Sequence, residues 1–255
     1  MLAPDALREL LEDHLEGLSF PAALHGQEAS MRYAVAGGKR VRGVICLATA
    51  EAAGSPVHVA LPAAAALELV HAFSLVHDDL PALDDDAERR GRPSVWAEFG
   101  EGVAVLAGDA LLAEGLRHAL SYPSPELGRE LTDATLGMIG GQYLDINRSE
   151  VDLAELHRLK TGRLFAASVG LGLWVADVAA PEQAAWRAFG EELGLLFQIV
   201  DDVLDGDGYS QRLGVEGARK LAAEAAARAR ARLAVLDADT TVLGEIVDGL
   251  TVRTA

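Results

Sequence analysis

Residues 75–91 read LVHDDLPALDDDAERRG, and the interpretation of the whole chain starts from this stretch. An apolar run from Leu61 to Val76 ends in five aspartates within nine positions, followed by two arginines. Carboxylates held this close repel one another, and divalent cations relieve that repulsion most simply. Because all of these ligands are oxygens, Mg²⁺, Ca²⁺ or Mn²⁺ is favoured over Zn²⁺. The stretch therefore predicts a metal site at the end of an apolar helix.

A second acidic cluster, FQIVDDVLD, occupies residues 197–205 and again ends an apolar, helix-like segment. At about 100° per residue, Asp201 and Asp205 lie about 40° apart on one helical face, so both carboxylates can reach one ion. In the first cluster, Asp78 and Asp84 would lie about 120° apart, and Pro81 interrupts the hydrogen bonds between them. We expect the helix to loosen there. Either acidic run alone is more often a solvated surface.

The composition favours a helical protein with ample length for a core. Hydrophobic residues make up 50% of the 255 residues and aromatic ones only 5%, and the alanine-rich segments favour helix over sheet. The formal net charge of −17 argues against nucleic acid or an anionic membrane surface as partner. Cys46 is the single cysteine and no basic region followed by an apolar core opens the chain, so we expect a cytoplasmic protein. Residues 57–76 approach membrane-spanning length, but Pro62 and Glu68 make a buried helix the better explanation.

A basic motif, GGKRVR, precedes the acidic ones at residues 37–42. Lys39, Arg40 and Arg42 stand at the start of a predicted helix, where cations oppose the helix dipole. A bound anion would explain them, because backbone N–H groups, the dipole and the basic side chains would all point at it. A basic turn on the surface is the alternative interpretation.

These motifs resemble those of the trans-prenyltransferases in the isoprenyl diphosphate synthase family. DDxxxxD at residues 78–84 is similar to the bacterial form of the first aspartate-rich motif, and DDxxD at 201–205 to the second. GGKRVR, GGQYLD at 140–145 and KTGRLF at 160–165 agree in order and spacing. The resemblance implies an all-α fold: one domain over residues 1–255, a bundle of about ten helices around a deep apolar cavity, with the acidic clusters facing each other across its mouth. It also implies a homodimer.

The resemblance implies a Mg²⁺ cofactor and assigns roles around it. The residues implied to hold the metal are Asp78, Asp84, Asp201 and Asp205. Those implied to act in catalysis are Asp79, Asp202, Lys160, Thr161 and Gln198. Of these, Lys160 would bind the allylic diphosphate, and Thr161 and Gln198 would lie near the developing carbocation or its leaving group. On its own, a lysine beside a threonine is usually surface decoration.

A further set is implied to bind the two substrates: Lys39, Arg42, His71, Phe73, Arg89 and Arg90. Lys39, Arg42 and Arg90 would hold the diphosphate of isopentenyl diphosphate. Arg89 would hold that of the allylic substrate, dimethylallyl or geranyl diphosphate. Guanidinium groups suit diphosphate because they donate paired hydrogen bonds and stay charged. A lone histidine on an apolar helix is more often a core residue, but the resemblance implies that His71 contacts isopentenyl diphosphate.

Phe73 is the residue that bears on product length. It stands five positions before Asp78, about 140° around the helix and roughly 7.5 Å deeper along its axis. If the aspartates anchor the diphosphate end, a ring deeper in the cavity could block a growing chain. In the family, an aromatic residue here accompanies short products, commonly the C15 farnesyl chain. An ordinary core phenylalanine is the alternative.

The apolar periodicity predicts the helices listed next. They cover residues 4–18, 27–36, 40–53, 58–80, 99–120, 126–146, 152–175 (as one or two helices), 181–204, 216–236 and 241–252.

The chain departs from the family pattern after the second acidic cluster. Family members usually carry a loop there whose lysines cover the allylic diphosphate. Here residues 206–215 run almost directly into the next helix, so roughly 25 to 40 residues are missing. A lid excludes the water that would quench an allylic cation. We therefore expect lower affinity and rate, or a partner subunit that supplies the cover, with Arg212 and Lys220 as nearby substitutes.

The sequence is interpreted as a Mg²⁺-dependent prenyltransferase that condenses isopentenyl diphosphate with an allylic diphosphate into a short-chain, C15 product. One alternative is an impaired or regulatory subunit of a heteromeric prenyltransferase, for which the missing loop is the indication. Another is a class I terpene cyclase. Such an enzyme needs no isopentenyl site, so the basic set at Lys39, Arg42, His71 and Arg90 argues against it.

Overall fold

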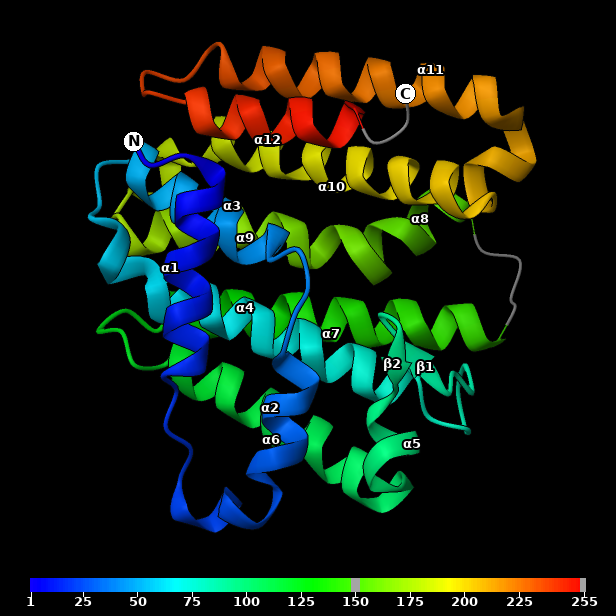
Figure 1. Ribbon diagram of the computed structural model, residues 1–255. Coiled ribbons are helices and arrows are strands. Elements are labelled where there is room, and N and C mark those ends of the chain that lie inside the picture. The colour runs from blue at the N-terminus through cyan, green and yellow to red at the C-terminus, as the bar shows by residue number, and fades with distance from the viewer. Residues whose placement is uncertain (148–151, 253–255) are drawn as a thin grey trace.

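The computed structural model describes residues 1–147 and 152–252, and these residues are almost entirely helical (Figure 1). The elements are α1 (Pro4–Glu16), η1 (Ala22–Gln27), α2 (Glu28–Val35), α3 (Val41–Ala52), α4 (Val57–Asp78), β1 (Glu88–Arg89), β2 (Arg92–Pro93), α5 (Val95–Phe99), α6 (Glu101–Ala119), α7 (Glu126–Asn147), α8 (Leu153–His157), η2 (Arg158–Gly162), α9 (Arg163–Val175), η3 (Ala180–Glu182), α10 (Ala184–Asp205), α11 (Gly208–Leu233) and α12 (Thr241–Val252). The predicted all-α class is confirmed.

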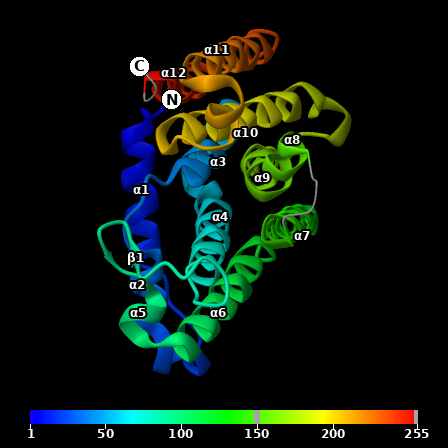
Figure 2. The ribbon, with the colours of Figure 1, turned by 90° about the vertical axis from the view of Figure 1, so that its right-hand side faces the viewer.

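Helix α4 forms the centre of the bundle. It is apolar around its whole circumference, as expected of a helix that is packed on all sides. It contacts α1, α2, α3, α6, α7 and α9, and Figure 2 shows it between α1 on one side and α7 and α9 on the other. By length and hydropathy α4 could cross a membrane, but 67% of its apolar window is buried inside the protein. Packing therefore accounts for its composition, and its last turn delivers the first acidic cluster to the surface.

The three helices α10, α11 and α12 pack together at one end of the bundle, at the top of Figure 1. Only Gly206 and Asp207 connect α10 to α11, and Gly206 ends α10 in the left-handed conformation that glycine favours. The helix expected from residue 216 therefore begins earlier, at Gly208. It bends at Gly214, whose φ of 72° is not helical. The direct connection expected from the sequence is present.

Two other predicted helices are divided. The helix expected at 99–120 is two, α5 and α6, because Gly100 between them has φ of 89°. The segment expected at 152–175 comprises α8, the π-helical turn η2 and α9. A π-turn inside a helix often marks a functional site.

A buried ion-pair network joins α1, α3 and α4. Arg40 is only 4% exposed and has left-handed backbone angles, with φ of 53°. Its guanidinium donates to both carboxylate oxygens of Glu12 at 2.9 Å and to the Val35 carbonyl at 2.7 Å. It also lies 3.6 Å from Glu68, which accepts a hydrogen bond from the Gly43 N–H at 2.9 Å. Arg40 is thus held by the fold, unlike the neighbouring Arg42.

Candidate functional site

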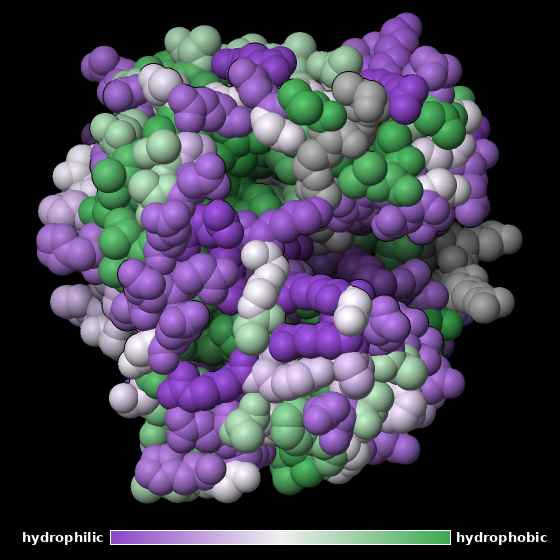
Figure 3. Space-filling model, in the orientation of Figure 1, coloured by the Kyte–Doolittle hydropathy of each residue, from purple (hydrophilic) through white to green (hydrophobic). Residues whose placement is uncertain are grey.

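A cavity of about 800 Å³ lies between the ends of α3, α4, α7, η2 and α10 and the β1–β2 hairpin. Figure 3 shows hydrophilic side chains gathered across the middle of one face of the molecule, around hollows in the surface. Most of the residues expected in the site line this cavity. They are Lys39, Arg42, His71, Phe73, Asp78, Arg89, Arg90, Lys160, Thr161 and Asp201.

The three aspartates expected from the first acidic cluster have different surroundings. Asp78 is the last residue of α4 and lines the cavity. The helix loosens after it as expected: the Asp84 N–H donates to the Asp78 carbonyl at 2.9 Å, which returns Asp84 to the helix end with an exposed side chain. Asp79 is 2% exposed and is not a lining residue, because its carboxylate accepts from the guanidinium of Arg89. Arg89 also lies 3.1 Å from Asp86.

The second cluster divides in the same way. Asp201 lines the cavity, whereas Asp205 is exposed at the end of α10 and does not. Asp202 is 2% exposed and accepts hydrogen bonds from the Gln198 side-chain amide at 2.7 Å and from the Tyr209 N–H at 2.8 Å. Gln198 and Asp202 therefore fasten the start of α11 to α10, and neither lines the cavity.

The residues at the mouth fit a magnesium ion held jointly with a phosphate substrate. Within residues 1–147 and 152–252, no three His, Cys, Asp or Glu side chains converge closely enough to hold an ion by themselves. The pKa of Asp78 is raised to about 6, mainly by burial; Lys160 opposes the rise, and the nearby carboxylates of Asp84 and Asp79 contribute to it. A divalent cation would neutralise this excess negative charge. Mg²⁺ commonly takes one or two carboxylates and completes its shell with substrate phosphates and water.

Asp78→Asn is expected to stabilise the Mg²⁺-free protein above pH 6, on the order of 2 kcal/mol. The folded-state pKa of about 6 exceeds the ordinary aspartate value of about 4. Folded wild-type protein therefore binds this proton more tightly than the unfolded chain does, and its stability falls as the pH rises from about 4 to 6. Urea unfolding of both proteins from pH 4 to pH 8 measures the difference. An equal stability difference at all pH values would contradict the prediction.

The β1–β2 hairpin carries Arg89 and Arg90 to the cavity. Its two turn residues, Arg90 and Gly91, have φ of 56° and 73°, the pattern of a type I′ turn. Arg90 donates to the Gly37 carbonyl at 2.8 Å. A Cβ on Gly38 would lie 2.9 Å from the guanidinium nitrogens of Arg90, so this glycine is needed for the approach. The hairpin and the GGKRVR loop thus form one basic wall.

Arg42 extends the basic wall, and His71 lines the same cavity. The Arg42 guanidinium lies over the rings of Phe165 and Phe197, with its central carbon 4.5 and 5.7 Å from the ring centroids. Burial lowers the pKa of Arg42 to about 10, so it stays charged at neutral pH. Burial, reinforced by Arg42 and the other arginines, lowers the pKa of His71 well below its ordinary value. His71 is therefore a neutral hydrogen-bonding group.

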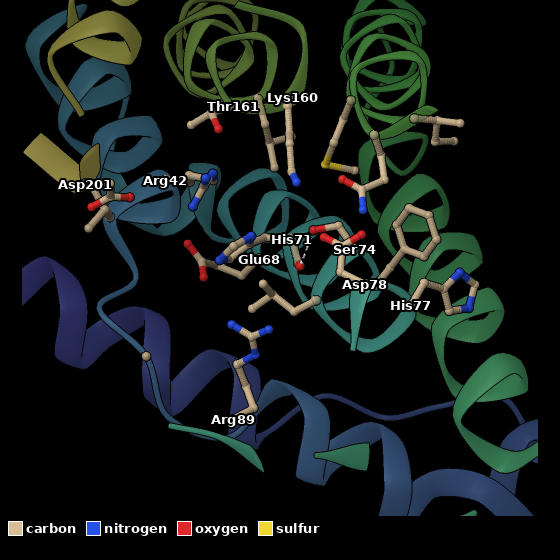
Figure 4. A pocket seen from close by; sticks show the side chains of 18 of the residues that line it. Arg42, Glu68, His71, Ser74, His77, Asp78, Arg89, Lys160, Thr161 and Asp201 are labelled. Atoms are coloured by element: carbon tan, nitrogen blue, oxygen red, sulfur yellow. Dashed lines mark hydrogen bonds between the residues drawn. The ribbon is translucent and has the colours of Figure 1, made fainter. Parts of the chain in front are cut away.

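Figure 4 shows how these side chains face one another: Lys160 and Thr161 project into the pocket from η2, and Asp78, His71 and Arg42 lie below them. Lys160 forms an ion pair with Asp145 on α7 at 2.5 Å. The close approach of η2 to α7 depends on Gly141, where a Cβ would lie 2.5 Å from the Lys160 backbone nitrogen. The GGQYLD and KTGRLF motifs therefore meet, which explains the second of the two glycines, Gly141.

Gly141→Ala is expected to push η2 away and lower the turnover rate about 100-fold, because a displacement of about 1 Å at a substrate-binding group has that effect. Gly140→Ala is the matched control, since a Cβ there meets nothing within 4 Å. The control should keep its activity and gain up to about 1 kcal/mol in helix stability. Steady-state rates of both variants, with circular dichroism to check folding, make the comparison. Equal rates would show that η2 tolerates the shift.

The rest of the lining includes a polar group and an apolar wall that were not predicted as site residues. Gln142 follows the two glycines, and both atoms of its side-chain amide are buried with no hydrogen-bond partner in the described part of the chain. The GGQYLD motif was the available signal for it. The apolar lining residues, besides Phe73, include Met138, Ile139, Ile146, Leu164 and Phe197. The cavity therefore suits a ligand with a polyanionic head and an apolar tail.

The comparisons with known proteins agree with this geometry. A family model described as polyprenyl synthetase matches residues 26–218. The heterodimeric geranylgeranyl pyrophosphate synthase large subunit 1 of Arabidopsis thaliana is 41% identical over 215 residues, 76% of this chain and 58% of that protein. The farnesyl diphosphate synthase of Bacillus subtilis is 39% identical over 220 residues, 80% of this chain and 73% of that protein. The solved geranyltransferase from Legionella pneumophila is 30% identical, with a TM-score of 0.88 over 98% of this chain and 96% of that one.

The fold and the cavity define a helical bundle of the isoprenoid synthase type, to which a solved protein of Thermotoga neapolitana is also assigned, with a TM-score of 0.77 to this chain. The chain belongs to the polyprenyl synthetase family. The resemblance drawn from the motifs is therefore confirmed. The chain spans less of the Arabidopsis relative than of the bacterial one, at 58% against 73% of their lengths.

Proposed function

We propose that the protein is a Mg²⁺-dependent prenyltransferase that joins isopentenyl diphosphate to dimethylallyl or geranyl diphosphate and releases pyrophosphate. The observation that carries this proposal is the cavity, in which Asp78 and Asp201 share one lining with Arg42, Arg90 and Lys160 and with apolar side chains. Two diphosphates bound near each other need both cations and metal-binding carboxylates. An apolar wall then accepts the prenyl tail.

The two diphosphates would bind on opposite sides of the cavity. Lys39, Arg42 and Arg90 would hold the diphosphate of isopentenyl diphosphate, and the neutral imidazole of His71 would add a hydrogen bond without adding charge. The allylic diphosphate would lie near Lys160 and Thr161, with Asp78 and Asp201 directed at its metal ions. Arg89 is expected at the same diphosphate, although it is paired with Asp79.

The reaction needs charge stabilisation at the departing pyrophosphate. Mg²⁺ held by Asp78 and Asp201 would supply part of it by neutralising the phosphate oxygens. Lys160 adds a positive charge on the same side, and the apolar lining keeps water from the allylic cation. The double bond of isopentenyl diphosphate attacks this cation and forms the new C–C bond. The proton lost from the adduct passes to the released pyrophosphate, so no side chain is assigned as base.

We propose a C15 product because Phe73 lines the cavity and is 7% exposed. The names of the relatives do not decide the length, since both farnesyl and geranylgeranyl synthases are among them. The support is therefore the position of the ring, about 7.5 Å deeper along α4 than Asp78.

A regulatory or partner-dependent subunit is the second candidate function. The specific observation is the two-residue connection between α10 and α11, which leaves no segment for a lysine-bearing lid. One similar protein is named the large subunit of a heterodimeric synthase. For this chain, a heteromeric partner would have to supply cations near Asp201.

The experiment that tests the proposal incubates the purified chain with Mg²⁺, labelled isopentenyl diphosphate and either dimethylallyl or geranyl diphosphate. Chromatography then separates the products by chain length. A labelled C15 product that requires Mg²⁺ supports the prenyltransferase. Longer products would contradict only the C15 assignment. No product from folded protein would favour the subunit function, and an unlabelled cyclic hydrocarbon from geranyl diphosphate alone would indicate a cyclase.

We further propose a cytoplasmic homodimer. Support for the dimer is a group of exposed apolar side chains on α6 and α7, two helices that contact each other. Those that lie outside the cavity lining are Val103, Leu106 and Leu136. A mass from light scattering equal to one chain would contradict the dimer.

A further inference from the structure

His77 lies between α4 and α6 at the edge of the cavity, and the proposed reaction gives it no role. Figure 4 shows its side chain beside Asp78, at one side of the pocket. Its Nε2 atom is 3.0 Å from the carbonyl oxygen of Val105 on α6. A carbonyl oxygen only accepts hydrogen bonds, so Nε2 must carry a proton and donate. The ring is therefore anchored to α6 at one atom.

The shape of α6 anchors the same ring a second time. A Cβ placed on Gly108 would lie 2.2 Å from Nε2 and 2.3 Å from Cδ2 of His77. No side chain fits there while the ring keeps its position. Gly108 is thus a notch in α6 that receives the imidazole, and the hydrogen bond to Val105 fixes how the ring is turned within it.

The imidazole ring of His77 also contacts the ring of Phe73. Phe73 precedes His77 by four residues, so both side chains lie on one face of α4. The two ring centroids are 5.0 Å apart with an angle of 76° between the planes, an edge-to-face arrangement. The Phe73 ring has no polar atom to anchor it, and its direction depends on two side-chain torsions. The fixed imidazole restricts those torsions.

We propose that His77 is a positioning residue for product length. Held by Gly108 and Val105, it keeps the Phe73 ring directed into the cavity, so that the ring ends the space available to the growing prenyl chain. Without His77 the ring could turn aside, and the cavity would accept another C5 unit. This inference rests on the proposed function. It adds a second residue that controls product length, His77, one helical turn away from Phe73.

The first test compares the products of His77→Ala and Gly108→Ala with those of the wild type. Both variants are expected to raise the ratio of the next longer product to the wild-type product by about fivefold, the effect of losing one edge-to-face contact. Gly102→Ala, on the same helix, is the control, because a Cβ there meets nothing within 4 Å. Its product ratio should equal that of the wild type. Variants that turn over more slowly but keep the wild-type ratio would overturn the proposal.

The second test asks whether His77 acts through Phe73. Phe73→Ala should lengthen the products by itself, and Phe73→Ala combined with His77→Ala should give the same product ratio as Phe73→Ala alone. A further increase in the double variant would show that His77 limits length independently, which contradicts a positioning role.

The third test does not depend on turnover. The chain has six phenylalanines, so 4-fluorophenylalanine labelling gives few ¹⁹F resonances, and Phe73→Leu identifies the one from Phe73. In His77→Ala this resonance should shift and narrow as the ring gains motion, and in Gly102→Ala it should not. An unchanged resonance would contradict the proposal that His77 holds the Phe73 ring in place. If the resonance moves but no protein in the series makes product, His77 does hold the ring and the proposed function fails.

Discussion

Asp78→Asn should lower the rate of prenyl transfer about 10²–10³-fold, which is the usual effect of removing one group that stabilises transition-state charge. Asp78 lines the cavity at the end of α4, and the burial that raises its pKa also strengthens its interaction with a metal ion. The amide keeps the size of the side chain but loses the charge. Initial rates at saturating Mg²⁺ measure the loss of prenyl transfer. Calorimetric titration of Mg²⁺ in the presence of pyrophosphate measures the loss of the interaction with the metal ion.

Asp85→Asn is the matched control for this loss. Asp85 belongs to the same acidic run, but it is exposed and does not line the cavity. Its φ of 55° is left-handed, a conformation that asparagine tolerates as well as aspartate. The control should keep a rate within about twofold of the wild type. A comparable loss in both variants would show that the rate depends on the total negative charge of the run and not on Asp78.

Arg40→Ala should lower the free energy of unfolding by about 3–5 kcal/mol, because it leaves two carboxylates without their buried partner. Arg40 is enclosed between Glu12 and Glu68 and is 3% exposed at its side chain. Urea denaturation at pH 7 measures the change. Arg8→Ala is the control: its pair with Asp5, at 3.6 Å, is exposed, so the change should stay within about 0.5 kcal/mol.

Arg40→Gly separates the loss of the guanidinium from the cost of the left-handed backbone at this position. Glycine removes the same guanidinium but adopts the left-handed backbone without cost, so it should be about 1 kcal/mol more stable than Arg40→Ala. A loss below about 1 kcal/mol in both variants would mean that Glu12 and Glu68 find other partners.

Helical periodicity predicted the main elements of the fold, because most helices bury one regular face. The breaks within these helices were harder to predict from the sequence. A glycine within an apolar pattern can be a packing position, as at Gly108, or a break, as at Gly100, and only the packed neighbours distinguish the two. The π-turn at Arg158–Gly162 carries no periodic signal, since it adds a single residue to a turn.

The motifs identified the candidate site more completely than the roles of its residues. In each aspartate pair one member lines the cavity and the other does not, because consecutive residues on a helix point about 100° apart. This could have been argued from the sequence. The partners of Asp79 and Asp202 could not, since Arg89 and the N–H of Tyr209 reach them only after the hairpin and the α10–α11 turn have formed.

The short turn between α10 and α11 is also a position at which a new segment can be inserted. Gly206 and Asp207 are exposed, and the core packing of α10 and α11 begins on either side of them. Closing a flexible segment of about 30 residues costs only about 3 kcal/mol in chain entropy. A lid borrowed from a longer relative could therefore be spliced in here without disturbing the bundle, provided that Asp202 keeps its bond to Tyr209. The α10–α11 turn would then be one fixed position at which different lids can be compared.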